Sequence, residues 1–167
     1  MTSKLMVMGV SGCGKSTVAA RLAQALGCPL IEGDDYHLPQ SQDKMRRGIA
    51  LGDADRDPWL DRLGAMLAEA PGSVVLTCSA LKRSYRERLR AAEPQLRVVF
   101  IDIDIDESRK RVAARPSHLF PASLVDNQFA TLESPVGEPG VFRIEATDSL
   151  DAQCNAVLRW LEKTSSS

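Results

Sequence analysis

The sequence predicts an α/β fold in which helices flank a parallel sheet, and two observations lead to this prediction. Short apolar runs rich in Val, Ile, Leu and Phe alternate with segments of helical periodicity, which is typical of consecutive β-α-β units. The runs are almost continuously apolar, as expected for strands that are covered on both faces. Five strands are predicted, over residues 4–10, 29–33, 73–78, 97–103 and 141–145.

Helical spacing of apolar residues predicts five main helices, over residues 15–26, 58–70, 84–92, 107–114 and 150–162. Gly27 is placed to end the first helix in a left-handed conformation. Asp57 as N-cap and Pro58 as first residue are expected to open the second. Asp148 or Ser149 is expected to cap the last helix.

Two irregular stretches interrupt this alternation. Residues 34–57 are polar, and residues 115–140 hold several prolines and glycines around a short helical patch at 122–132. Long excursions from an α/β core are usually lids or substrate-binding segments, with mobile connectors as the alternative. The length of 167 residues predicts that both belong to a single domain over residues 1–167.

Charge and hydropathy exclude several classes of protein. Lys and Arg total 21 and Asp and Glu total 22, a balance that argues against a nucleic-acid backbone or an anionic membrane as the main partner. No apolar run approaches the roughly 18 residues of a membrane span, and the first apolar run is too short for a secretory signal. We therefore expect a cytoplasmic protein, whose four widely spaced cysteines are reduced structural thiols.

The strongest motif is a phosphate-binding loop that matches G-x-x-x-x-G-K-[ST] between a predicted strand and a predicted helix. Backbone N–H groups of such a loop and the helix N-terminus surround a polyphosphate. Lys15 is expected to reach the β- and γ-phosphates, and the Ser16 hydroxyl to ligate Mg²⁺. An ordinary glycine-rich turn is the alternative. The predicted nucleotide-binding residues here are Gly9, Val10, Ser11, Gly12, Cys13, Gly14, Lys15, Ser16 and Thr17.

The remaining motifs favour a small kinase over other nucleotide-binding proteins. The N-K-x-D motif of GTPases is missing, and the D-x-x-G match at residues 61–64 lies inside a predicted helix. An ATPase motor would need further domains for which this chain has no room. A kinase needs an acceptor site and a lid that excludes water, and residues 34–57 and 115–140 suit those roles. A regulatory nucleotide-binding module without transfer is the alternative from another class.

The second predicted strand ends in a stretch with three acidic residues, which reads Glu-Gly-Asp-Asp-Tyr-His over residues 32–37. Ligands of open α/β sheets lie beyond the carboxyl ends of the strands, so these acids should face the phosphate loop. A carboxylate there can hold Mg²⁺ through water or accept the proton of an attacking hydroxyl, and Asp34 is the candidate for the second role. Helix capping by Asp34 or Asp35 is the alternative. His37 is expected either to bind a polyol or to act as a structural donor.

Six motifs follow one another over residues 5–134: Gly9 to Ser16, Gly33-Asp34-x-x-His37, Lys44-Met45-x-x-Gly48-x-x-Leu51, Asp55-Arg56-x-Pro58-Trp59-Leu60, Cys78-Ser79-Ala80-Leu81-Lys82-x-x-Tyr85-Arg86 and Gln128-Phe129-x-Thr131-Leu132-Glu133. In these motifs the chain resembles the gluconokinase family, whose members phosphorylate D-gluconate on O6 with ATP and Mg²⁺. The resemblance implies the P-loop kinase fold of nucleoside monophosphate and shikimate kinases, with a five-stranded parallel sheet, an acceptor segment and a lid. It also implies gluconate as the small-molecule partner and allows a homodimer.

The same resemblance implies roles for several basic residues. A site for gluconate needs a cation for the carboxylate, and the candidates for the carboxylate and polyol are Lys44, Arg56, Lys82 and Arg86. Arg111 and Arg115, which share a helix face, align with basic residues that clamp nucleotide phosphates.

In the lid, Arg115 is expected to neutralise charge on the transferring group, and His118 belongs to the resembling lid segment. The chain departs from the family pattern in the acceptor loop and the lid, for example at Ser41, where the family usually has Asn. Another small hydroxy acid or a nucleotide is therefore the alternative acceptor.

Overall fold

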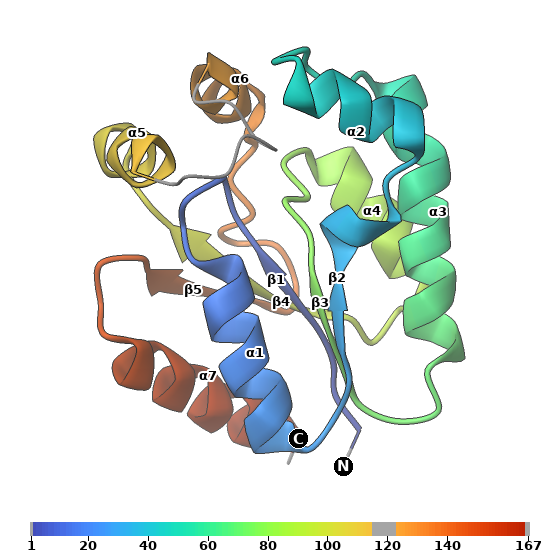
Figure 1. Cartoon of the computed structure of the whole chain (residues 1–167). Helices are drawn as coiled ribbons and strands as arrows, with labels where there is room; N and C mark the ends of the chain where they lie inside the picture. Colours follow the sequence, from blue (N-terminus) through green and yellow to red (C-terminus); the bar gives the residue numbers. More distant parts are fainter. Residues whose placement is uncertain (1, 115–122, 166–167) are drawn as a thin grey trace.

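The computed structural model describes residues 2–114 and 123–165, which build a five-stranded parallel sheet in the order β2-β3-β1-β4-β5 (Figure 1). The strands are β1 Lys4–Met8, β2 Leu30–Glu32, β3 Val74–Thr77, β4 Arg97–Asp102 and β5 Val141–Glu145. All five predicted strands are confirmed, each with ends within two residues of the prediction.

Helices cover both faces of this sheet (Figure 1). They are α1 Lys15–Leu26, α2 Pro39–Arg46, α3 Asp53–Glu69, α4 Arg83–Ala92, α5 Ile105–Ala113, α6 Ser123–Thr131 and α7 Leu150–Ser165, together with the 3-10 helix η1 Gly33–Tyr36. Leu5 and Val7 of β1 pack into a core with α1 and α7, whereas Met6 and Met8 pack into a second core with α3 and α4. Burial on both faces explains why the strand sequences are continuously apolar.

Local signals at three helix ends act as physical chemistry predicts. Gly27 ends α1 with a left-handed φ of 64°, as expected for a residue without a Cβ. Of the two candidate caps of α7, Ser149 is the one whose Oγ accepts a hydrogen bond, from the Ala152 N–H at 3.1 Å. Helix α5 begins two residues before its predicted start, because Asp104 accepts the Glu107 N–H at 2.9 Å as its N-cap.

The prediction that Asp57 and Pro58 open the second helix is wrong, because α3 begins at Asp53 and Pro58 lies inside it. The earlier start is stabilised by Asp55, whose Oδ2 accepts the Gly52 N–H at 2.9 Å. Pro58 has no N–H to donate to the preceding turn, but this local loss is offset by burial of Trp59, Leu60 and other apolar residues that follow it. Five additional residues of the polar stretch are thereby helical.

Other parts of the irregular stretches are also ordered. Helices η1 and α2 occupy residues that carried no helical prediction, and the short patch expected at 122–132 is α6. Across residues 2–114 and 123–165, no helix combines the length and the apolar character that crossing a membrane requires.

Candidate active site

The phosphate loop connects β1 to α1 at the carboxyl edge of the sheet. Gly9 has a φ of 151°, and a Cβ at this position would lie 2.8 Å from Cys13 Sγ and 2.9 Å from the Ile101 carbonyl oxygen. The side chains of Val10 and Cys13 are buried in the core below the loop. These two residues therefore offer backbone groups, not side chains, to a ligand above the loop.

Two helices hold this loop from the side. Ser108 on α5 donates its hydroxyl to the Ser11 carbonyl at 2.6 Å, and Arg111 Nη1 donates to the Gly12 carbonyl at 3.1 Å. From α6, Gln128 Oε1 accepts the Ser11 N–H at 2.7 Å. The loop is thus fixed by contacts from segments about 100 residues away in the sequence, which preorganises its backbone.

Lys15 and Ser16 begin α1 directly after the loop. Lys15 Nζ donates to the carbonyls of Gly9 at 2.9 Å and Val10 at 3.3 Å, and within the described residues no carboxylate lies within ion-pair distance of it. Its positive charge therefore remains available to an anion that lies over the loop.

The hydroxyl of Ser16 meets a carboxylate at the end of β2. Ser16 Oγ donates to Glu32 Oε2 at 3.0 Å, and Thr77 Oγ1 donates to the same oxygen at 2.7 Å. No cluster of three or more His, Cys, Asp or Glu side chains suited to a metal ion occurs within 2–114 and 123–165. One hydroxyl and one carboxylate nevertheless fit Mg²⁺, because this ion usually takes most of its ligands from phosphates and water.

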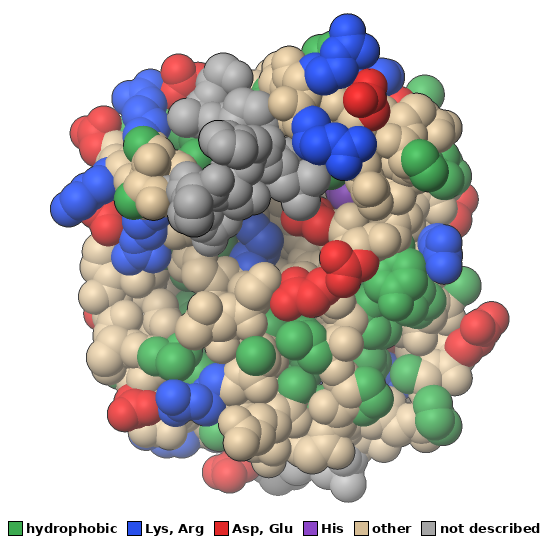
Figure 2. Space-filling model, viewed as in Figure 1, with side chains coloured by type: hydrophobic (Ala, Val, Ile, Leu, Met, Phe, Trp, Pro, Cys, Tyr) green, Lys and Arg blue, Asp and Glu red, His purple; other side chains and the backbone are tan. Residues whose placement is uncertain are grey.

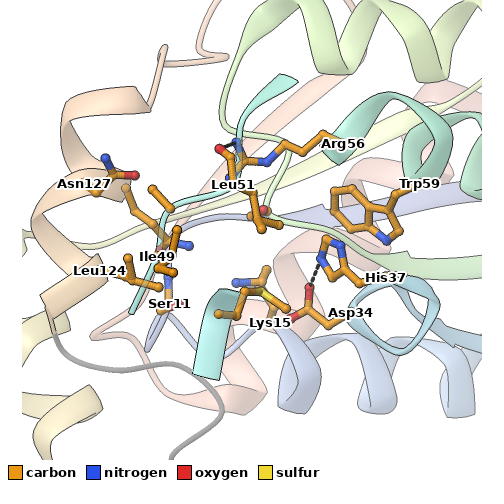
Figure 3. Close-up of a pocket in the computed structure, with 14 residues that line it drawn as sticks. Ser11, Lys15, Asp34, His37, Ile49, Leu51, Arg56, Trp59, Leu124 and Asn127 are labelled. Atoms are coloured by element: carbon orange, nitrogen blue, oxygen red, sulfur yellow. Dashed lines mark hydrogen bonds and ion pairs between the residues drawn. The ribbon is translucent and has the colours of Figure 1, made fainter. Parts of the chain in front are cut away.

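A pocket of about 520 Å³, open space at its mouth included, lies between the phosphate loop, η1, the end of α2, α3 and α6 (Figure 3). Figure 2 shows that the same face of the molecule is hollowed, with charged side chains around the hollow. The described lining residues are Ser11, Lys15, Asp34, His37, Met45, Ile49, Ala50, Leu51, Arg56, Trp59, Ser79, Leu124, Asn127 and Gln128.

Asp34 projects into this pocket from η1, next to Lys15 (Figure 3). The close approach of η1 to β3 requires Gly33, because a Cβ there would lie 2.2 Å from the Thr77 carbonyl oxygen. The Asp34 side chain is 66% exposed and forms no cap of η1, so the alternative role in capping is not observed.

The charge state of Asp34 depends on its neighbours. Desolvation of the carboxylate by the surrounding protein favours the protonated acid and would raise its pKa. The hydrogen bond with His37 and the positive charge of Lys15 together outweigh this effect, so the pKa of Asp34 is lowered. His37 Nε2 lies 3.3 Å from Asp34 Oδ1, and its ring stacks on Trp59 at 3.9 Å between centroids. Trp59 in turn donates its indole N–H to the Gly33 carbonyl at 2.7 Å. Asp34 is therefore an ionised acceptor held in place through its bond to His37.

The described lining of the pocket contains one lysine, Lys15, and one arginine, Arg56. Arg56 Nη1 donates to the Leu51 carbonyl at 2.8 Å and to the Tyr85 hydroxyl at 3.3 Å. Figure 3 shows Arg56 away from Lys15 and Asp34, so the pocket carries positive charge in two separate places.

The two candidate lysines lie outside the pocket lining. Lys44 Nζ pairs with both carboxylate oxygens of Asp55, at 3.0 and 3.1 Å. Lys82 Nζ pairs with Asp53 Oδ1 at 3.1 Å. Both cations are thus neutralised by carboxylates of the first turn of α3.

The prediction that Arg86 binds the substrate is contradicted by its position. Its side chain is 0% exposed, and its guanidinium donates to the carbonyls of Ala80 and Glu133 and to both carboxylate oxygens of Glu138, at 2.7 and 3.0 Å. A guanidinium whose donors are already used by buried acceptors cannot also hold a ligand. Arg86 instead links α4 to the segment between α6 and β5.

Arg111 joins the phosphate loop to the backbone that follows β5 at the same carboxyl edge of the sheet. Besides its bond to Gly12, its Nε donates to Glu107 at 3.0 Å and its Nη2 to the Ala146 carbonyl at 3.2 Å. The remaining two lid candidates, Arg115 and His118, lie outside the described residues.

Several residues of the site were not among the predicted ligands. Glu32 follows from the general expectation that acids at the end of β2 face the loop. Ser79 and Gln128 belong to motifs of the family resemblance, so a signal for them existed, but no chemical role could be assigned before the pocket was known. Tyr85, which also belongs to such a motif, contacts Arg56.

Comparisons with known proteins agree with this geometry. A family model described as an AAA domain matches residues 5–135. The gluconokinase of Gluconobacter oxydans is 45% identical over 158 residues, covering 93% of this chain and 89% of the relative, and that of Arabidopsis thaliana is 35% identical, covering 95% and 92%.

Solved structures give the same result. A gluconokinase from Sinorhizobium meliloti superposes with a TM-score of 0.90 at 41% identity, covering 98% of this chain and 93% of that one. The shikimate kinase of Aquifex aeolicus, at 20% identity and a TM-score of 0.66, shares the fold, with 97% and 98% covered. The predicted P-loop kinase fold is confirmed, and the chain belongs to the gluconokinase family.

Proposed function

We propose that this protein transfers the γ-phosphoryl group of ATP to O6 of D-gluconate, giving 6-phospho-D-gluconate and ADP. The observation that carries the proposal is the pocket, which has Asp34 and Lys15 beside the phosphate loop and the cation Arg56 apart from them. Gluconate has a primary hydroxyl at one end and a carboxylate at the other. Its hydroxyl can therefore meet Asp34 while its carboxylate meets Arg56.

The nucleotide would bind over the phosphate loop, in contact with the backbone of residues 9–14 and with the first turn of α1. Bound Mg²⁺ would neutralise phosphate charge, with Ser16 as a direct ligand and Glu32 acting through water. Lys15 would turn from the loop carbonyls to the phosphates. Arg111 supports the loop from α5, and Arg115 and His118 are proposed to close over the site from the lid.

Asp34 would act on the acceptor hydroxyl. Its lowered pKa keeps it ionised, so it can accept a hydrogen bond from the O6 hydroxyl and aim that oxygen at the phosphorus atom. As the new O–P bond forms, the proton passes to the carboxylate. The transition state of phosphoryl transfer is loose and needs little deprotonation in advance, so the main contribution of Asp34 is orientation.

A coupled assay of ADP release tests this function, with D-gluconate, shikimate and AMP offered side by side. We expect turnover with gluconate, and we expect Lys15→Ala to reduce kcat by at least about 100-fold because it removes charge stabilisation of the transferring group. Circular dichroism should show that the variant stays folded. Turnover with shikimate or AMP but not gluconate, or full activity of Lys15→Ala, would contradict the proposal.

The alternative of a non-catalytic nucleotide sensor gives a different result in the same experiment. A sensor would show thermal stabilisation by ATP without acceptor-dependent release of ADP. Homodimer formation and a cytoplasmic location stay predictions, which light scattering and cell fractionation would check.

A further inference from the structure

The guanidinium of Arg56 is only partly used by the protein. Its Nη1 has two N–H groups, and the structure provides two acceptors, the Leu51 carbonyl and the Tyr85 hydroxyl. Nε and Nη2 have no hydrogen-bond partner within residues 2–114 and 123–165. Nε–H and one N–H of Nη2 point in parallel and match the two oxygens of a carboxylate. The edge that suits a bidentate carboxylate is therefore the edge left open.

A chain of hydrogen bonds leads from Nη1 away from the pocket. The Tyr85 hydroxyl donates its single proton to Asp53 Oδ1 at 2.6 Å, so its lone pairs are left to accept from Arg56. Asp53 also accepts from Lys82 at 3.1 Å. The hydrogen bonds from Tyr85 and Lys82 lower the pKa of Asp53, which is therefore an ionised, strong acceptor. The direction of every bond in this chain is thereby fixed.

The aromatic ring of Tyr85 also contacts the two cations of this hydrogen-bonded chain, Arg56 and Lys82. Tyr85 is buried on α4, and its ring centroid lies 5.3 Å from Arg56 Cζ and 5.6 Å from Lys82 Nζ. Arg56 and Asp53 are three residues apart near the start of α3. The hydroxyl of Tyr85 thus bridges two side chains of the same helix, and the position of that helix start is set by the Gly52 and Asp55 contact.

We propose that Tyr85, held by Asp53, is a positioning residue that keeps the Nε–Nη2 edge of Arg56 open to the pocket and so makes the acceptor site selective for a carboxylate. The inference rests on the proposed function, because it concerns the same acceptor. Without the hydroxyl, Nη1 would keep one of its two acceptors, and the guanidinium would have to be ordered when the substrate binds. That cost reduces affinity for a carboxylate and leaves the phosphate loop unchanged.

Tyr85→Phe separates this role from a structural one. The substitution keeps the buried ring and its contacts with both cations and removes only the hydroxyl. Asp53 is 63% exposed, so water can replace the lost donor. Tyr36→Phe is the matched control, because Tyr36 packs against Arg62 at 4.8 Å and does not line the pocket.

The test measures steady-state kinetics of the full chain with D-gluconate and ATP, and competitive inhibition by D-glucitol. D-glucitol carries a CH₂OH group in place of the carboxylate. For Tyr85→Phe we expect the KM for gluconate to rise about 10-fold, with kcat, the KM for ATP and the inhibition constant of D-glucitol within about twofold of the wild type. Tyr36→Phe should change none of these values.

Three outcomes would overturn the inference. In the first, the KM for gluconate stays unchanged in Tyr85→Phe. In the second, this KM rises together with the inhibition constant of D-glucitol, which indicates general damage to the pocket. In the third, the effects of Asp53→Ala and Tyr85→Phe on the KM add in the double variant, whereas a single chain of hydrogen bonds predicts that the double variant has the KM of Tyr85→Phe alone. Absence of gluconate turnover in the wild type would contradict the proposed function itself.

Discussion

At the level of single residues, the role proposed for Asp34, accepting a hydrogen bond from the attacking hydroxyl, requires an ionised carboxylate. Two neighbours ensure this: His37, which is hydrogen-bonded to Asp34, and Lys15, whose charge acts through space. His37 is itself held by stacking on Trp59 and lies almost fully buried. The pocket thus keeps a weak base in a fixed orientation, which suits a reaction whose transition state asks for little proton transfer.

This arrangement predicts the pH dependence of a His37→Phe variant. Phe keeps an aromatic ring on Trp59 but removes the hydrogen bond that lowers the pKa of Asp34, so that pKa should rise. The acid limb of kcat/KM for gluconate should therefore move to higher pH than in the wild type, as measured by pH-rate profiles. Asp34→Asn is the reference, with a loss of about 100-fold or more and no carboxylate limb. An acid limb at the same pH in His37→Phe would show that this bond does not control the charge of Asp34.

At the level of secondary-structure elements, α3 and α4 pack closely at a glycine. A Cβ on Gly64 would lie 2.8 Å from Ala92 Cβ, which is closer than carbon atoms pack without displacement. Both helices carry site residues, Arg56 and Tyr85 among them, so the distance between the helices matters for the pocket. The D-x-x-G match at residues 61–64 lies inside α3, as predicted, and its Gly64 packs against α4.

Gly64→Ala should therefore destabilise the fold, by about 1–3 kcal/mol in the free energy of unfolding, because an extra methyl group is forced into a filled interface. Urea unfolding followed by circular dichroism measures this. Gly72→Ala is the control, since no atom lies within 4 Å of a Cβ there, and its stability should be unchanged or slightly higher. Equal stabilities of the two variants would show that α3 and α4 separate without cost.

Elements with strong burial were predictable, and those without it were not. The strands are apolar on both faces, so length and composition identify them. Helix α2 buries only Ser41 and Met45, and its sequence therefore lacks an apolar stripe from which a helix could be inferred. The start of α3 at Asp53 is stabilised by the hydrogen bond from the Gly52 N–H to Asp55, whereas the helix-start pattern that stands out in the sequence is Asp57 before Pro58.

The candidate site shows the same division. The phosphate loop and Asp34 were predictable because a local motif or a strand end determines them. The basic residues of 82–90 were not, because their partners lie far away in the sequence: Lys82 pairs with Asp53, and Arg86 with Glu138. A basic residue in a family motif can either bind the ligand or stabilise the fold, and the two roles are distinguished only when the position of its acidic partner is known.

At the level of the whole molecule, the pair of Arg86 and Glu138 connects α4 to the segment that leads from α6 to β5. Glu138 accepts from Arg86 and also from Arg90 at 2.9 Å, and its side chain is 7% exposed. The backbone of the same segment is joined to the residues just before α4 through Glu133, whose N–H donates to the Leu81 carbonyl at 2.8 Å. This cluster fixes the chain just after α6, which supplies Gln128 to the phosphate loop.

The hydrogen bond from Arg86, together with Arg90, lowers the pKa of Glu138. A carboxyl group with a lowered folded-state pKa stabilises the fold above its unfolded pKa, and this stability is lost as the pH falls through the folded pKa. Glu138→Gln should therefore cost about 3–5 kcal/mol at neutral pH, because it leaves Arg86 buried without its countercharge, and it should reduce the acid dependence of stability. Urea unfolding between neutral and acidic pH measures both effects.

The control is Asp61→Asn, which breaks the exposed ion pair with Arg88 and should change the free energy of unfolding at neutral pH little. If the two variants lost similar stability, the Arg86–Glu138 pair would not be what holds this segment in place.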